Sequence, residues 1–147
     1  MCGKNFPECV MRIMLDTNVL VSAVLYPHSS VTSALLRATQ KHTLVICTYV
    51  LEELHSVFER KFPHKQEQLS NFLSNFAYEP CPTPSISQNT PTMRDDGDRP
   101  ILQAAIDSKV DMILTGDLDF HVLELDYPRI IAPAEFLFHQ RIDNAVE

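Results

Sequence analysis

The sequence contains little glycine and no long apolar run. Its three glycines, Gly3, Gly97 and Gly116, are too far apart for a phosphate-binding loop or a dinucleotide fingerprint, which needs several glycines within a few residues. No apolar stretch reaches the roughly 18 residues that span a bilayer, so we expect no membrane segment. The first residues hold no apolar core of a secretory signal, and we therefore expect a cytoplasmic protein.

Paired cysteines with the spacing of metal ligands are also missing. None of the four cysteines forms a C-x-x-C pair, and the six histidines are dispersed, so zinc is weakly supported. We expect free thiols, as is usual in a reducing compartment.

Positive charge is scarce. The chain has 12 Lys and Arg against 19 Asp and Glu, a net charge of −7, which argues against a protein that coats nucleic acid through basic residues. The acidic excess lies in the second half of the chain, whereas the first half is nearly neutral. It is either a solvated acidic surface or a cluster that binds a cation, and the local spacing of the acids must decide.

The chain length of 147 residues fits one domain. We predict an N-terminal extension over 1–11, a single domain over 12–139 and a C-terminal tail over 140–147. Apolar runs predict buried strands, and amphipathic or capped segments between them predict helices. The strands are expected at 12–15, 43–48, 111–115 and 129–132, with a short edge strand near 77–81. The helices are expected at 19–25, 30–41, 49–62, 66–76, 99–109, 120–125 and 133–139. This alternation indicates an α/β/α sandwich with a mainly parallel central sheet.

Acidic residues follow the predicted strands or begin the helices after them. Asp16 ends the first strand, and Asp117 follows the strand at 111–115. Asp98 stands at the start of a helix, where we expect it to act as the N-cap, and Glu53 lies in the first turns of another helix. Because ligand sites of parallel sheets lie beyond the carboxyl ends of the strands, these four carboxylates are expected to converge.

The helix at 49–62 offers two adjacent glutamates. With 100° per residue, Glu53 lies at the edge of the apolar sector, whereas Glu52 points nearly opposite to its centre. We therefore favour Glu53 as the site residue and keep Glu52 as the alternative.

Converging carboxylates repel one another unless a cation lies between them. Mg²⁺ or Mn²⁺, as one or two ions, is the natural counter-charge, and such ions support the hydrolysis of phosphodiesters. A phosphatase with an aspartate nucleophile is disfavoured, because Asn18 stands where its D-x-D motif needs the second aspartate.

Four ordered motifs resemble those of the PIN-domain nucleases, most nearly the bacterial toxin components of type II toxin–antitoxin systems. They are Leu15-Asp16-Thr17-Asn18-Val19-Leu20, Leu51-Glu52-Glu53-Leu54, Arg94-Asp95-Asp96-Gly97-Asp98 and Thr115-Gly116-Asp117-Leu118-Asp119-Phe120. The resemblance covers about 12–138, which is nearly the whole chain.

This resemblance implies a PIN-like fold and a metal-dependent endoribonuclease that cleaves RNA, commonly as a homodimer held by a cognate antitoxin. It implies that Asp16, Glu53, Asp98 and Asp117 are catalytic acids and metal ligands, with Asp119 as a further ligand. Supporting residues around them, which would steady the ligands through hydrogen bonds, are expected to be Thr17, Asn18, Asp95 and Thr115. The alternative is a catalytically silent PIN-fold module that binds protein or RNA.

Overall fold

A five-stranded sheet forms the centre of the computed structural model, which describes residues 10–85, 90–94 and 96–146, with the side chains after Gln140 left out. The order of the strands is β3-β2-β1-β4-β5, and all four pairings are parallel. The strands are β1 (Arg12–Leu15), β2 (Thr43–Cys47), β3 (Glu79–Cys81), β4 (Met112–Leu114) and β5 (Arg129–Ile131). The predicted fold class is therefore confirmed.

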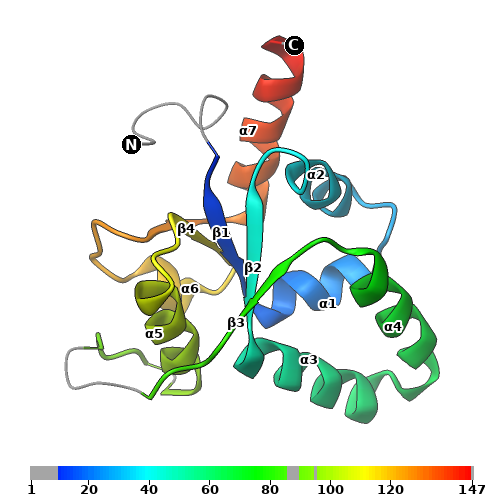
Figure 1. Cartoon of the computed structure of the whole chain (residues 1–147), viewed down its shortest axis with the longest axis horizontal. Coiled ribbons are helices and arrows are strands. Elements are labelled where there is room, and N and C mark those ends of the chain that lie inside the picture. Colours follow the sequence, from blue (N-terminus) through cyan, green and yellow to red (C-terminus); the bar gives the residue numbers. More distant parts are fainter. Residues whose placement is uncertain (1–9, 86–89, 95, 147) are drawn as a thin grey trace.

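Helices cover both faces of this sheet, as Figure 1 shows, with α1, α2 and α4 on one side of the strands and α5 and α6 on the other. Two single 3₁₀ turns, η2 (Pro63–Lys65) and η3 (Asp96–Asp98), precede α4 and α5. The helices are α1 (Thr17–Leu25), α2 (Ser30–Ala38), α3 (Thr48–Lys61), α4 (Gln66–Asn75), α5 (Arg99–Asp107), α6 (Leu118–His121) and α7 (Pro133–Val146).

The three central strands, β2, β1 and β4, are short apolar runs, as expected for strands with helices on both faces. Ile13, Met14 and Leu15 of β1 are fully buried, and so are Val45 and Ile46 of β2. The apolar face predicted for the helix after β2 also packs inward, since Val50, Leu54 and Phe58 have no exposed surface. The largest buried side chains thus come from the central strands and from helices on both faces of the sheet, with Phe58 of α3 and Phe120 of α6 among them.

Side-chain caps fix where the first two helices begin. The carboxylate of Asp16 accepts a hydrogen bond of 2.9 Å from the Val19 amide and starts α1 directly after β1. Ser29 does the same for α2, accepting from the Thr32 amide at 3.1 Å. Because an N-cap satisfies one of the unpaired amides of the first turn, the chain turns abruptly from strand to helix at Asp16.

Three local predictions were wrong. Asp98 holds the N-cap position of α5, but its side chain makes no capping hydrogen bond, because the preceding 3₁₀ turn already leads into the helix. The short helix after β4 covers 118–121 rather than 120–125, since Asp117 caps it. The last helix continues to Val146, beyond the predicted end at 139. The predicted domain bounds, 12–139 with a tail at 140–147, stay a prediction.

Cys47 and Cys81 are buried free thiols, whereas Cys2 and Cys9, in the predicted extension, lie outside the described residues. Within the described ranges no single helix is long and apolar enough to cross a membrane. The consecutive pair α1 and α2 meets that criterion only when taken together, and it bends by 112°.

Candidate active site

The site begins where the two central strands end. β1 and β4 pair in parallel with Leu15 opposite Leu114, so the residues that follow these strands, Asp16 and Thr115, come together at the carboxyl edge of the sheet. The Thr115 hydroxyl donates a hydrogen bond to Oδ2 of Asp16 and accepts one of 3.0 Å from the amide of Asp117. One buried hydroxyl thus connects the two acids that follow neighbouring strands.

A second threonine connects α1 with α3. Thr17, the first residue of α1, donates its hydroxyl hydrogen to Oε1 of Glu53. Glu53 lies in the second turn of α3, and α1 and α3 pack against each other. The hydrogen bond therefore holds the Glu53 carboxylate on the side of α3 that faces the end of β1, as the helical geometry predicted.

These acids converge on one pocket of about 180 Å³ at the carboxyl edge of the sheet. Two apolar side chains, Val57 of α3 and Ile101 of α5, complete its wall. The residues that line it are Asp16, Thr17, Asn18, Glu53, Val57, Asp98, Ile101 and Asp117. All four predicted catalytic acids therefore lie at a single cavity.

Asp119 joins this group from the first turn of α6. One carboxylate oxygen each of Asp98, Asp117 and Asp119 lies within 4.8 Å of the other two. The Asp119 amide also donates a hydrogen bond of 2.9 Å to Oδ1 of Asp117, which fixes the start of α6 against the site. Three half-buried carboxylates at this separation can share one cation.

Burial raises the pKa of Asp16. The side chain is nearly inaccessible, and this desolvation raises the pKa of Asp16 above its ordinary value. The hydrogen bonds from Thr115 and the Val19 amide lower the pKa and partly offset that effect, whereas the nearby charges of Asp117 and Glu53 raise it further. A cation in the pocket would counter both causes of the increase.

The donors of the pocket suit a hard divalent cation. All of its charged groups are carboxylates, and neither cysteine nor histidine is among the lining residues. Mg²⁺ and Mn²⁺ prefer oxygen ligands of this kind. The pocket can therefore hold a cation between its carboxylates.

The other residues considered from the sequence differ in whether they line the pocket. Asn18 lines the pocket with an exposed side chain, whereas Glu52 is exposed on α3 and is not part of the lining. Asp95 lies outside the described residues. Thus, of the two glutamates on α3, only Glu53 borders the pocket.

Two neighbours of the acids were missed from the sequence. Nε2 of His121 lies 2.8 Å from the carbonyl oxygen of Thr115, a contact that depends on α6 beginning immediately after Asp117. Nε of Arg94 lies 3.3 Å from Oδ1 of Asp119. Arg94 belongs to one of the four acidic motifs, but the motif gives no indication that its only basic residue turns toward Asp119.

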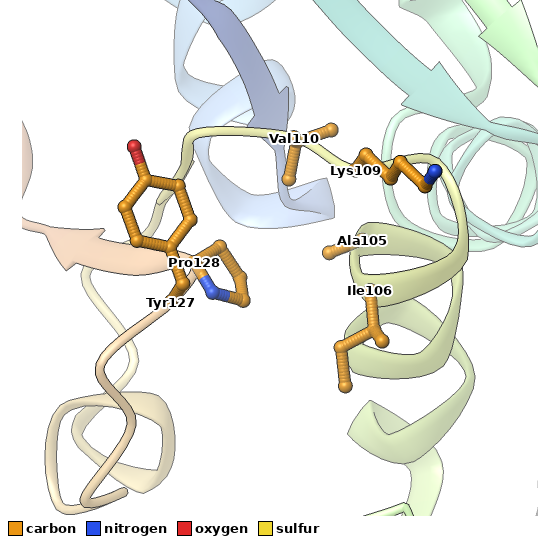
Figure 2. A pocket seen from close by; sticks show the side chains of 6 residues that line it. All are labelled: Ala105, Ile106, Lys109, Val110, Tyr127 and Pro128. Carbon is orange, nitrogen blue, oxygen red and sulfur yellow. The ribbon is translucent and has the colours of Figure 1, made fainter. Parts of the chain in front are cut away.

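A larger hollow, of about 260 Å³, lies near the opposite edge of the sheet, before β4 and β5 begin. Figure 2 shows the rings of Tyr127 and Pro128 facing Ala105 and Ile106 across it. Its lining contains one charged side chain and no acid: Ala105, Ile106, Lys109, Val110, Tyr127 and Pro128. Its lining has no carboxylate, histidine or cysteine that could hold a metal ion, so the acidic pocket is the candidate active site.

A comparison with known protein families gives a match. The sequence profile of the PIN domain matches residues 12–119, well over half of the chain and all four acidic motifs. None of the curated proteins compared with the chain matches it significantly.

Two solved structures share the fold. A chain of VapBC2 from Rickettsia felis, bound to a DNA fragment from its promoter, is 22% identical with a TM-score of 0.62, and the match covers 83% of this chain and 98% of that chain. A chain of DNA-bound VapBC from Salmonella typhimurium is 17% identical with a TM-score of 0.63, and the match covers 84% of this chain and 99% of that chain. At such low identity the likeness concerns the fold.

Proposed function

Because the chain belongs to the PIN domain family, we propose that it is a metal-dependent endoribonuclease that hydrolyses RNA phosphodiesters. The observation that carries this proposal is the convergence of Asp16, Glu53, Asp98 and Asp117 on one pocket. Five carboxylates, counting Asp119, gather where the ends of β1 and β4 meet α3, α6 and the 3₁₀ turn before α5. Structural needs alone do not explain such a group, because like charges at this distance oppose folding.

Asp98, Asp117 and Asp119 would hold a divalent cation, with Asp16 and Glu53 as the acids that complete the site for one or two ions. A bound Mg²⁺ or Mn²⁺ would supply the Lewis acid that polarises the phosphoryl oxygen and favours deprotonation of a water.

The protein itself contributes position and charge. Thr115 and Thr17 orient the carboxylates of Asp16 and Glu53 through their hydroxyl groups, so these acids are fixed before any ligand arrives. Val57 and Ile101 complete the wall of the pocket with apolar side chains. Partly buried charged groups interact more strongly than they would at an open surface.

We further propose that this nuclease is the toxin of a toxin–antitoxin pair in the cytoplasm, and that it forms a homodimer bound by a cognate antitoxin. The VapBC complexes that share its fold support the presence of a protein partner. A short reading frame beside its gene, encoding a protein that copurifies with it, is the expected observation.

The test is cleavage of a short single-stranded RNA with Mn²⁺, compared with the same DNA sequence and with samples containing EDTA. We expect cleavage of RNA that requires the metal, and its loss in Asp16→Asn and Asp117→Asn. Asp126→Asn is the matched control, because it makes the same change at an exposed acid that does not line the pocket. Unchanged cleavage in both site variants would refute the shared metal site.

Calorimetric titration with Mn²⁺ separates this proposal from a catalytically silent binding module. A nuclease of this kind binds Mn²⁺ near neutral pH and loses that binding in Asp117→Asn. Absence of Mn²⁺ binding and of cleavage in the wild-type protein would favour the silent module.

A further inference from the structure

An arginine reaches the acid cluster from outside the pocket. Nε of Arg94 lies 3.3 Å from Oδ1 of Asp119, whose other neighbours in the cluster are Asp98 and Asp117. The cluster thus has a positively charged neighbour, contributed by the segment just before α5.

The ion pair leaves most of the guanidinium accessible. The Arg94 side chain is 88% exposed, whereas that of Asp119 is 16% exposed, and the contact uses Nε alone. An exposed pair with one such contact contributes little to stability, so it is broken at small cost. The two terminal nitrogens are well suited to grip a phosphate, because guanidinium binds phosphate through two parallel hydrogen bonds.

The backbone that leads to Arg94 is anchored to the core and to α5. The preceding residue, Met93, is buried in the core. Thr90, a few residues earlier, donates its hydroxyl hydrogen to Gln103 of α5, and its carbonyl oxygen accepts a hydrogen bond of 3.0 Å from Arg99. The long side chain of Arg94 therefore extends into solvent from a fixed position next to the acids.

We propose that Arg94 binds the RNA backbone, holding a phosphate beside the acidic pocket; this inference rests on the proposed ribonuclease function. The need for such a contact follows from charge. Five acids surround the site in a chain whose net charge is −7, so an approaching phosphate is repelled until cations offset the acids. Bound divalent ions remove part of that repulsion, and Arg94 adds a fixed positive charge on the side of Asp119.

The experiment compares wild type with Arg94→Ala and Arg94→Lys. Arg129→Ala is the matched control, because it removes the same exposed side chain from the start of β5, at the opposite edge of the sheet. Cleavage of the short RNA with saturating Mn²⁺ gives KM and kcat over a range of salt concentrations. Fluorescence anisotropy measures RNA binding, and calorimetry measures Mn²⁺ binding.

We expect Arg94→Ala to raise the KM for RNA roughly 5- to 20-fold, in line with the loss of one exposed charge-assisted phosphate contact. The slope of log KM against log salt should become shallower by about 0.7, the value for one phosphate contact on a single strand. Arg94→Lys should recover part of the affinity for RNA. In Arg94→Ala, Mn²⁺ binding should be at least as tight as in wild type, because the competing partner of Asp119 is gone.

Three results would overturn this role of Arg94. The first is an unchanged KM and salt slope in Arg94→Ala, with or without tighter Mn²⁺ binding, which would make Arg94 a counter-ion only. The second is a parallel loss of Mn²⁺ affinity and kcat, which would mean that Arg94 only maintains the arrangement of the acids. The third is an equal effect of Arg129→Ala, which would indicate a general effect of net charge.

Failure of the ribonuclease function gives a different pattern. If wild type binds RNA without cleaving it, and Arg94→Ala still weakens binding with the shallower salt slope, the function is refuted while the phosphate contact stands. If wild type neither binds nor cleaves RNA, both proposals are refuted.

Discussion

Replacing Asp16 with asparagine is expected to abolish metal binding while leaving the fold at least as stable as before. The carboxylate has two structural partners, the Val19 amide and the Thr115 hydroxyl. Asparagine keeps an oxygen for the amide and caps helices about as well as aspartate does. Its side-chain amide can donate to the Thr115 hydroxyl, so the change removes the negative charge and little else.

The expected changes in melting temperature follow from the loss of the cap of α1 and from the binding of the metal. Alanine at this position would lose the cap of α1, a cost of about 1 kcal/mol, so Asp16→Ala should unfold about 2–4 °C below Asp16→Asn. Mn²⁺ at about 100 times its Kd stabilises a binding protein by about 2.7 kcal/mol, which corresponds to about 5–11 °C for a chain of this size. Wild type should show that increase, and both variants should lack it.

The pH dependence of the metal-free protein follows from the raised pKa of Asp16. At pH values below its ordinary pKa of 3.8, Asp16 is protonated in the folded and the unfolded state alike, so it adds no pH dependence to the free energy of unfolding. Between 3.8 and the raised folded pKa, the folded state binds more protons than the unfolded state, so the stability of wild type decreases relative to Asp16→Asn as pH increases. At pH values above the folded pKa, the difference in the free energy of unfolding between wild type and Asp16→Asn is constant. The asparagine variant is therefore more stable by this full difference at neutral pH.

Thermal unfolding followed by circular dichroism measures all of these quantities. Wild type, Asp16→Asn and Asp16→Ala are each melted with EDTA and with Mn²⁺, from mildly acidic to neutral pH. An equal Mn²⁺-dependent increase in the Tm of wild type and Asp16→Asn would refute Asp16 as a ligand. A metal-free Asp16→Asn that melts several degrees below wild type at neutral pH would show that the buried charge carries no cost.

Three further changes test the positions of other residues. Thr115→Val should destabilise the protein by about 1–3 kcal/mol in urea unfolding, because it leaves a buried carboxylate and an amide without their shared partner. No loss of stability would contradict the role of that hydroxyl. Glu53→Gln should reduce Mn²⁺-dependent RNA cleavage at least about tenfold, whereas Glu52→Gln should leave it unchanged. Equal effects of these two substitutions would mean that cleavage does not depend on which side of α3 the glutamate occupies. Phe58→Ala should cost about 3–5 kcal/mol in urea unfolding, since Phe58 is fully buried, and a cost below 1 kcal/mol would place it outside the tightly packed core.

The sequence is informative wherever an apolar run ends at a polar residue. The run before Asp16 predicts both a buried strand and its end, because a charged residue cannot continue between two layers of helices. The same pattern predicts that the strand at 111–115 ends before Asp117, one residue beyond the observed end of β4 at Leu114. Helical periodicity also assigns Glu53 to the inner edge of α3, since the buried positions Val50 and Leu54 fix the orientation of that helix.

Local patterns are less informative where the backbone changes direction. The helix predicted at 120–125 begins two residues earlier, because the cap formed by Asp117 starts α6 at Leu118. This shift of two residues brings His121 back to the carbonyl oxygen of Thr115. Asp98 is a different case. This residue type usually caps helices, but here it ends a 3₁₀ turn, makes no capping hydrogen bond and turns its carboxylate to the acid cluster.

The contact that organises the site lies beyond any local pattern. Thr115 and Asp16 are separated by 99 positions in the sequence, and they meet because β4 pairs with β1 rather than with β3, the preceding strand along the chain. Alternation of strands and helices predicts a parallel sheet but not this order. With β4 beside β3, Asp117 would lie at an edge of the sheet, several strand spacings from Asp16. The choice of neighbour at the centre of the sheet therefore determines both the burial of Asp16, which raises its pKa, and the convergence of acids that a cation can offset.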